Sequence, residues 1–202
     1  MKCRHLLLAA FLPMAANLLH AQSVEPSKLV AIVRPVGDSK VMGSVTFEKT
    51  DEGVKVTASI GGLTPNAHHG FHIHQFGDLG SGDATSAGDH FNPGKHPHAM
   101  PDKEERHAGD LGNLVADGKG AATLTLTVDN ITLDAGPNGI LGRAVIVHAK
   151  ADDGGQPTGN AGDRIGAGVI GLSKDSGKEP AASDSAPAKG SSGPEGAKEE
   201  EG

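Results

Sequence analysis

A long stretch with little periodicity, from Phe76 to about Asp110, interrupts a chain that otherwise alternates between short apolar runs and turn residues. A loop of that length is unusual in a compact domain unless something inside it holds it together. The stretch and the residues just before it are rich in histidine, and one further histidine, His148, ends a short apolar run downstream. Imidazoles at this density, with a carboxylate among them, are typical ligands of copper and zinc. The sequence therefore predicts a loop organised by metal and attached to a frame of strands.

The segments around this stretch carry the pattern of short β-strands. From Val54 to Ile60, apolar and polar residues alternate, which is the period of a strand with one buried face. The preceding Asp51-Glu52-Gly53 is a hairpin signal. Comparable runs between turn residues are found at 29–34, 41–49, 69–75, 111–116, 121–129, 144–149 and 167–172. Thirty glycines and the lack of Trp and Tyr also suit short strands and tight turns, so an all-β sandwich or barrel is expected.

The N-terminus is typical of an export signal. A basic segment, residues 1–5, precedes an apolar run over about residues 6–19, and Ala21 offers a small residue at a plausible cleavage point. Residues 1–21 are interpreted as a secretory signal peptide, with an uncleaved anchor as the alternative. Export predicts a periplasmic or extracellular location. The only cysteine is Cys3, so the mature protein would have no thiol and no disulfide.

The C-terminal segment differs in composition from the domain that precedes it. Residues 173–202 consist mainly of Lys, Glu, Ser, Pro, Ala and Gly, and such a segment buries too little apolar surface to fold. We expect a disordered tail, with a tail that grips cell-wall polymer as the alternative, and one domain over residues 22–172. The formal charge of −7 argues against nucleic acid or an anionic membrane as a partner.

Two histidines in the predicted strand 69–75 are placed to bind one ion. His72 and His74 lie two residues apart, so their side chains project from the same face of the strand. His148, at the end of a neighbouring apolar run, can supply a third imidazole.

The long loop contains a second candidate ligand set. Three imidazoles and a carboxylate form a closed tetrahedral set of the kind that zinc accepts, here His90, His98, His107 and Asp110. If one imidazole gives a nitrogen to each ion, seven side chains serve two sites of four ligands each. The remaining histidines of this region are assigned ordinary roles: His68 and His96 as core or surface residues, and His69 as a structural hydrogen-bonding group.

Four blocks of the sequence resemble copper/zinc superoxide dismutase, and they occur in that family's order. They are Gly70–Asp78, Thr85–Pro93, Asp102–Asn113 and Gly159–Ile165, within a resemblance that covers about residues 28–172. The resemblance implies an eight-stranded Greek-key β-barrel, an immunoglobulin-like sandwich with a long metal-binding loop.

The resemblance also implies a role for each site residue. It assigns copper to His72, His74, His90 and His148, and zinc to His90, His98, His107 and Asp110. His90 would bridge the two ions. Asp152 would tie a copper ligand to a zinc ligand, and Arg164 would guide the anion to copper.

The implied activity is the disproportionation of superoxide to O₂ and H₂O₂, which would protect exported or envelope components. A homodimer is the habit of the family. One alternative is a non-catalytic copper or zinc carrier on the same fold, and another is a surface protein in which the tail carries the function. A carrier needs neither Arg164 nor a bridging His90, so the sequence favours the enzyme.

The chain departs from the family at two places. The family joins the long loop to the last strand by a disulfide, whose cysteines would stand at Asp83-Ala84 and at Ala167 here, and both are absent. We therefore expect the loop to depend more on zinc and on any subunit contact. The loop between Asp153 and Thr158 is only Gly-Gly-Gln-Pro, shorter than the charged steering loop common in the family.

Overall fold

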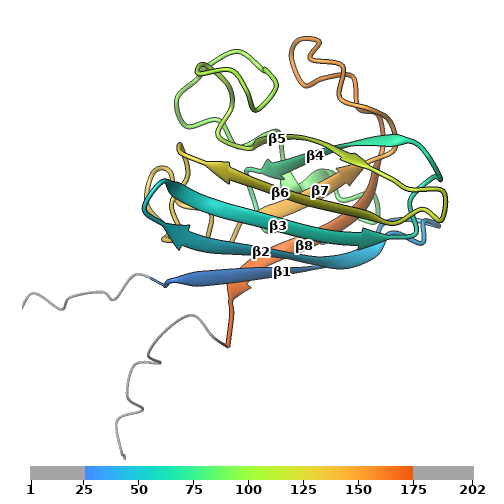
Figure 1. Ribbon diagram of the computed structural model, residues 1–202, viewed down its shortest axis with the longest axis horizontal. Coiled ribbons are helices and arrows are strands. Elements are labelled where there is room, and N and C mark those ends of the chain that lie inside the picture. Colours follow the sequence, from blue (N-terminus) through green and yellow to red (C-terminus); the bar gives the residue numbers. More distant parts are fainter. Residues whose placement is uncertain (1–25, 175–202) are drawn as a thin grey trace, which may run out of the picture.

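The computed structural model describes residues 26–174, which form eight β-strands and one short 3-10 turn (Figure 1). The strands are β1 Lys28–Pro35, β2 Met42–Thr50, β3 Gly53–Gly61, β4 His68–His74, β5 Asp110–Val115, β6 Ala122–Val128, β7 Ala144–His148 and β8 Arg164–Leu172, and the 3-10 turn η1 spans Thr85–Ala87. The expectation of an all-β fold is confirmed. Within the described part of the chain we find no helix with the length and apolarity that a bilayer crossing requires. The expected signal peptide and nearly all of the expected tail lie outside the described residues.

The eight strands form a nearly closed antiparallel barrel. Their order in the sheet is β5-β4-β7-β8-β1-β2-β3-β6, and every neighbouring pair is antiparallel. Pairing between strands that do not follow each other in the chain, such as β3 with β6 and β4 with β7, requires Greek-key crossovers at the ends of the barrel. The two long loops that cover the candidate site instead connect neighbouring strands, β4 with β5 and β7 with β8.

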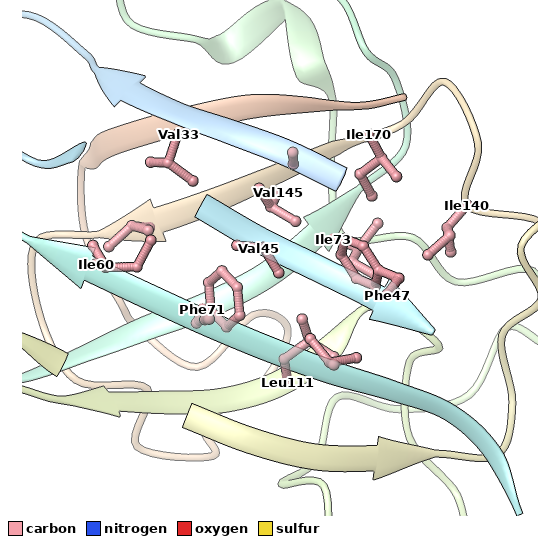
Figure 2. Packing of buried hydrophobic residues seen from close by; sticks show 14 of the residues in the cluster. Val33, Val45, Phe47, Ile60, Phe71, Ile73, Leu111, Ile140, Val145 and Ile170 are labelled. Carbon is pink, nitrogen blue, oxygen red and sulfur yellow. The ribbon is translucent and has the colours of Figure 1, made fainter. Parts of the chain in front are cut away.

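The barrel interior is filled by aliphatic and phenylalanine side chains from all around the sheet. Figure 2 shows them pointing toward one another, among them Phe47 of β2, Phe71 of β4 and Leu111 of β5. Each of these three is at most 1% exposed. The alternation expected over Val54–Ile60 appears in β3, where every second side chain is buried. The core thus fixes which face of each strand turns outward.

The long loop between β4 and β5 folds back onto the end of β4. The backbone N–H groups of Gln75 and Phe76 donate to the carbonyl oxygens of Asp89 and Ala87 at 2.9 Å each, and Phe91 N–H donates to Ile73 O at 2.8 Å. Apart from η1 and an isolated bridge between residues 74 and 90, the loop has no regular structure. The expectation of a long aperiodic segment is confirmed.

A small apolar cluster attaches the start of this loop to β7 and β8. It contains the two alanines at the positions where the family carries its disulfide, and its buried members are Ala84, Ala87, Ala144, Ile146 and Ala167. Ala84 adopts a left-handed backbone conformation, with φ of 59°. The loop is therefore held to the barrel here by apolar packing instead of a covalent bond.

Candidate metal centre

Strand β4 presents His72 and His74 on the outer face of the barrel. Phe71 and Ile73 point into the core (Figure 2), and because side chains alternate along a strand, His72 and His74 project to the opposite face. Both are nevertheless buried, at 0% and 2% exposure, because the long loop covers them. His72 pairs with Ile146 of β7, which brings His148 at the end of that strand to the same face.

All seven predicted ligands come together in two groups that share one residue. The first group is His72, His74, His90 and His148, and the second is His90, His98, His107 and Asp110. Within each group the candidate ligand atoms lie within 4.8 Å of one another, and every residue is buried. His90 belongs to both groups, as a bridging ligand must. His68 and His96 are exposed and belong to neither group.

In the first group, each histidine outside the shared position uses one ring nitrogen for the protein and leaves the other free. Nδ1 of His74 lies 2.8 Å from Gly88 O, and Nδ1 of His148 lies 3.0 Å from Gly162 O. Their Nε2 atoms face each other at 3.4 Å. His72 has the reverse arrangement: its Nε2 lies 2.8 Å from Asp152 Oδ2, and its buried Nδ1 has no hydrogen-bond partner. Three imidazole nitrogens are thus held for an ion, a donor set that fits copper.

In the second group, three Nδ1 atoms converge on one carboxylate. Asp110 lies 2.9 Å from Nδ1 of His90, 3.0 Å from Nδ1 of His98 and 3.3 Å from Nδ1 of His107. Backbone N–H groups of Ala99 and His107 also donate to Asp110 Oδ2, which fixes the carboxylate. Nδ1 of His98 is buried without a well-formed hydrogen bond. Three imidazoles and a carboxylate around one point fit zinc.

Asp152 connects the two groups. Its Oδ2 lies 2.8 Å from His72 Nε2, and its Oδ1 lies 3.0 Å from His98 Nε2. Asn113 of β5 fixes the backbone of Asp152 in both directions: Asn113 Nδ2 donates to Asp152 O at 2.9 Å, and Asp152 N–H donates to Asn113 Oδ1 at 2.8 Å. A carboxylate on the outer nitrogen of a ligand imidazole sets its tautomer and orientation. The positioning role of Asn113 was not predicted, because its partner is 39 residues away in the chain and no local spacing indicates the pair.

His69 supports the site from inside the barrel. It is fully buried, and its Nδ1 lies 2.8 Å from the carbonyl oxygen of His148. This contact agrees with the structural hydrogen-bonding role expected for His69. It fixes the backbone at the end of β7, where His148 leaves the strand.

Arg164, at the start of β8, is half-buried beside the first group. Its two Nη atoms donate to the carbonyl oxygens of Ala84 and Gly88. Gly88 O is also the acceptor beside Nδ1 of His74. The guanidinium is therefore joined through one carbonyl to a predicted copper ligand.

The electrostatics of the two groups differ. Burial lowers the pKa of His72 to about 3 and that of His148 to about 4, so both imidazoles are neutral at pH 7 and offer lone pairs. Burial also acts to lower the pKa of His98, but its bonds to Asp110 and Asp152 prevail and raise it to about 9. In spite of burial, the imidazoles around Asp110 and Asp152 hold the pKa of both carboxyls below its ordinary value. The second group therefore offers one charged carboxylate ligand, that of Asp110, and Asp152 beside it is charged as well.

Comparison with known proteins agrees with this geometry. Residues 41–170 match the family described as "Copper/zinc superoxide dismutase (SODC)". "Superoxide dismutase [Cu-Zn]" of Yarrowia lipolytica is 49% identical over 154 residues, which covers 72% of this chain and 97% of that protein. The Candida albicans protein of the same name is 49% identical over 156 residues, covering 73% and 99%. A crystal structure of the clock protein EA4 superposes with a TM-score of 0.69 at 42% identity, covering 77% of this chain and 100% of that one. The chain belongs to the copper/zinc superoxide dismutase family.

Proposed function

We propose that this superoxide dismutase acts outside the cytoplasm. In this proposal Arg164 guides the superoxide anion to the site, and His90 is the ligand shared by the two metals. In the reaction, two superoxide anions and two protons give one O₂ and one H₂O₂. The observation that carries the proposal is that two buried groups of four ligands share His90. When bound, copper supplies the one-electron redox chemistry and zinc fixes the shared imidazole.

The protein groups supply position, charge and a proton. Nδ1 of His90 faces Asp110 and the second group, so its Nε2 is the atom that can face copper and hold a proton for the reduced substrate. Arg164 offers a fixed positive charge for a small anion. Of its five N–H donors, the carbonyls of Ala84 and Gly88 take two, which leaves donors for a substrate.

The activity is tested on purified protein loaded with both metals. We expect one copper and one zinc per chain and superoxide consumption that cyanide inhibits. The His90→Gln variant, which keeps a polar side chain of similar reach, should lose this activity. A protein that binds both metals but does not consume superoxide would instead be a metal carrier.

Export is proposed from the N-terminal sequence, in which a basic segment precedes an apolar run and Ala21. Outside the cytoplasm, the protein would protect exported or envelope components from superoxide. N-terminal sequencing of the protein from fractionated cells tests this proposal. We expect a first residue just after Ala21 in the exported fraction, whereas an intact N-terminus in the cytoplasmic fraction would contradict it.

A homodimer is proposed through the face formed by β1 and β8. Ile32 of β1 and Val169 of β8 on this face are 53% and 44% exposed, although both are large and apolar. Ile32 and Val169 also line a hollow of about 490 Å³. An apolar patch of this kind favours association. We expect the protein to sediment as two copies and the Ile32→Glu variant as one, and a monomeric parent protein would contradict the proposal.

A further inference from the structure

Exposed aspartates lie next to the two residues whose carbonyls hold the guanidinium of Arg164. The two carbonyls that hold it belong to Ala84 and Gly88, and each of these residues is next to an aspartate in the chain, Asp83 and Asp89. Both aspartates are exposed, whereas Arg164 is half-buried. The guanidinium beside the first ligand group therefore has the carboxylates of Asp83 and Asp89 near it, and both face solvent.

The loop that carries these two carboxylates is fixed. Asp83 Oδ1 accepts hydrogen bonds from Thr85 N at 3.0 Å and from Thr85 Oγ1 at 2.7 Å, and these bonds lower the pKa of Asp83 to about 2. Gln75 holds Asp89 from both sides: Gln75 N–H donates to Asp89 O at 2.9 Å, and Asp89 N–H donates to Gln75 Oε1 at 3.2 Å. The carboxylate of Asp83 and the backbone of Asp89 are thus held in place near Arg164.

Arg164 and these carboxylates act on each other. Burial lowers the pKa of the Arg164 guanidinium, and the negative charges of Asp89 and Asp83 oppose that effect. The same charges must act with opposite sign on an anion that approaches Arg164, because an anion is attracted by the guanidinium and repelled by the carboxylates. Lys150, whose side chain lies beside Gly162, is a neighbouring cation.

We propose that Asp83 and Asp89 are specificity-determining residues that weaken anion binding at Arg164 and weaken it more for doubly charged than for singly charged anions. The inference rests on the guiding role of Arg164 given under Proposed function. Electrostatic energy is proportional to the charge of the anion, so the carboxylates oppose a dianion such as hydrogen phosphate twice as strongly as superoxide. The entrance then favours a small monoanion over the divalent anions that a bare arginine would bind more tightly.

The test uses the protein loaded with copper and zinc and measures azide and phosphate binding from the copper absorption spectrum at low ionic strength. The variant is Asp83→Asn with Asp89→Asn, which keeps the Oδ1 acceptor for Thr85. The matched control removes two exposed carboxylates from the β2–β3 turn, Asp51→Asn with Glu52→Gln. Metal content is measured for each protein.

We expect azide to bind the double variant about fourfold more tightly than the parent protein. Each removed carboxylate contributes about a factor of two, the effect of one unit charge on another through water over roughly one Debye length. Hydrogen phosphate should bind the double variant more tightly by about the square of that factor. The kcat/KM for superoxide should rise together with the azide affinity. High salt should abolish these differences.

Equal gains for azide and phosphate, or equal gains in the control, would overturn the inference. The Arg164→Gln variant separates this result from failure of the guiding role. If it weakens azide binding while the aspartate double variant changes nothing, only the inference fails. If it leaves azide binding unchanged, the guiding role fails and the inference fails with it.

Discussion

The imidazole of His74 and the guanidinium of Arg164 meet on one carbonyl oxygen, that of Gly88. His74 Nδ1 lies 2.8 Å from this oxygen, and Arg164 Nη2 lies 2.6 Å from it. A predicted metal ligand and the predicted anion guide are therefore positioned by the same peptide group of the long loop. Any displacement of this loop must change both.

Removal of the guiding charge should slow the enzyme without removing its metals. We expect Arg164→Gln to lower kcat/KM for superoxide roughly tenfold at low ionic strength and to flatten its dependence on salt, because a focused positive charge raises the encounter rate of an anion. Stopped-flow decay of superoxide over a series of salt concentrations measures both effects. Lys119→Gln, an equal charge change in the β5–β6 turn, is the control. An unchanged rate at low salt would refute the role of Arg164.

Removal of the Asp152 carboxylate, which connects the two ligand groups, should weaken metal binding in both. Asp152 holds His72 at 2.8 Å and His98 at 3.0 Å, and we expect Asp152→Asn to lower metal affinity and activity about 10- to 100-fold. Competition with a chromophoric chelator measures the affinity. Asp153→Asn is the matched control, because the exposed Asp153 carboxylate bonds only to its own loop. Equal affinities in the two variants would show that Asp152 does not position the ligands.

Zinc removal should release the long loop. Where the family carries its disulfide, this loop is attached through Ala84 and Ala167 by apolar packing. A ligand present at about a thousand times its Kd stabilises by about 4 kcal/mol, so we expect selective chelation of zinc to lower Tm by roughly 10 °C. Hydrogen exchange of residues 77–109 should accelerate, while that of β1–β3 stays slow. Unchanged Tm and protection would mean that the loop does not depend on zinc.

Zinc binding should release a proton at neutral pH. The pKa of His98 is raised to about 9, so this imidazole is charged at pH 7 in the metal-free protein and must lose its proton to bind an ion. We expect titration calorimetry in two buffers of different ionisation enthalpy to show release of about one proton per zinc at pH 7, falling toward zero above pH 9. A heat of binding independent of the buffer would contradict this assignment.

A side chain at Gly70 should displace the imidazole of His72 and so disturb the first ligand group. A Cβ atom there would lie 2.7 Å from Ala161 Cβ and 3.2 Å from His72 Cε1. We expect Gly70→Ala to cost about 1–3 kcal/mol of stability, the usual cost of overpacking, and to weaken metal binding. Gly82→Ala, where a Cβ meets nothing within 4 Å, is the control. Chemical denaturation and metal content measure the two effects, and equal stability of the two variants would refute the expected clash.

The sequence by itself determined the strands and the chemistry of the ligands. Alternation over Val54–Ile60 appears as the half-buried strand β3, and the two-residue spacing of His72 and His74 places both on one face, because these patterns depend only on local backbone geometry. The resemblance to a family supplied the ligand sets, and the structure brings their members together.

Only the tertiary structure decided which atoms meet. Nothing in the chain near Asn113 indicates that it fixes Asp152. Similarly, nothing near Arg164 indicates that it shares Gly88 O with His74, because Arg164 lies 76 residues from Gly88 in the chain. Likewise, which nitrogen each imidazole keeps free depends on the acceptor beside its other nitrogen. Such contacts join segments far apart in the sequence, so they are set by barrel closure and loop packing, which no local pattern records.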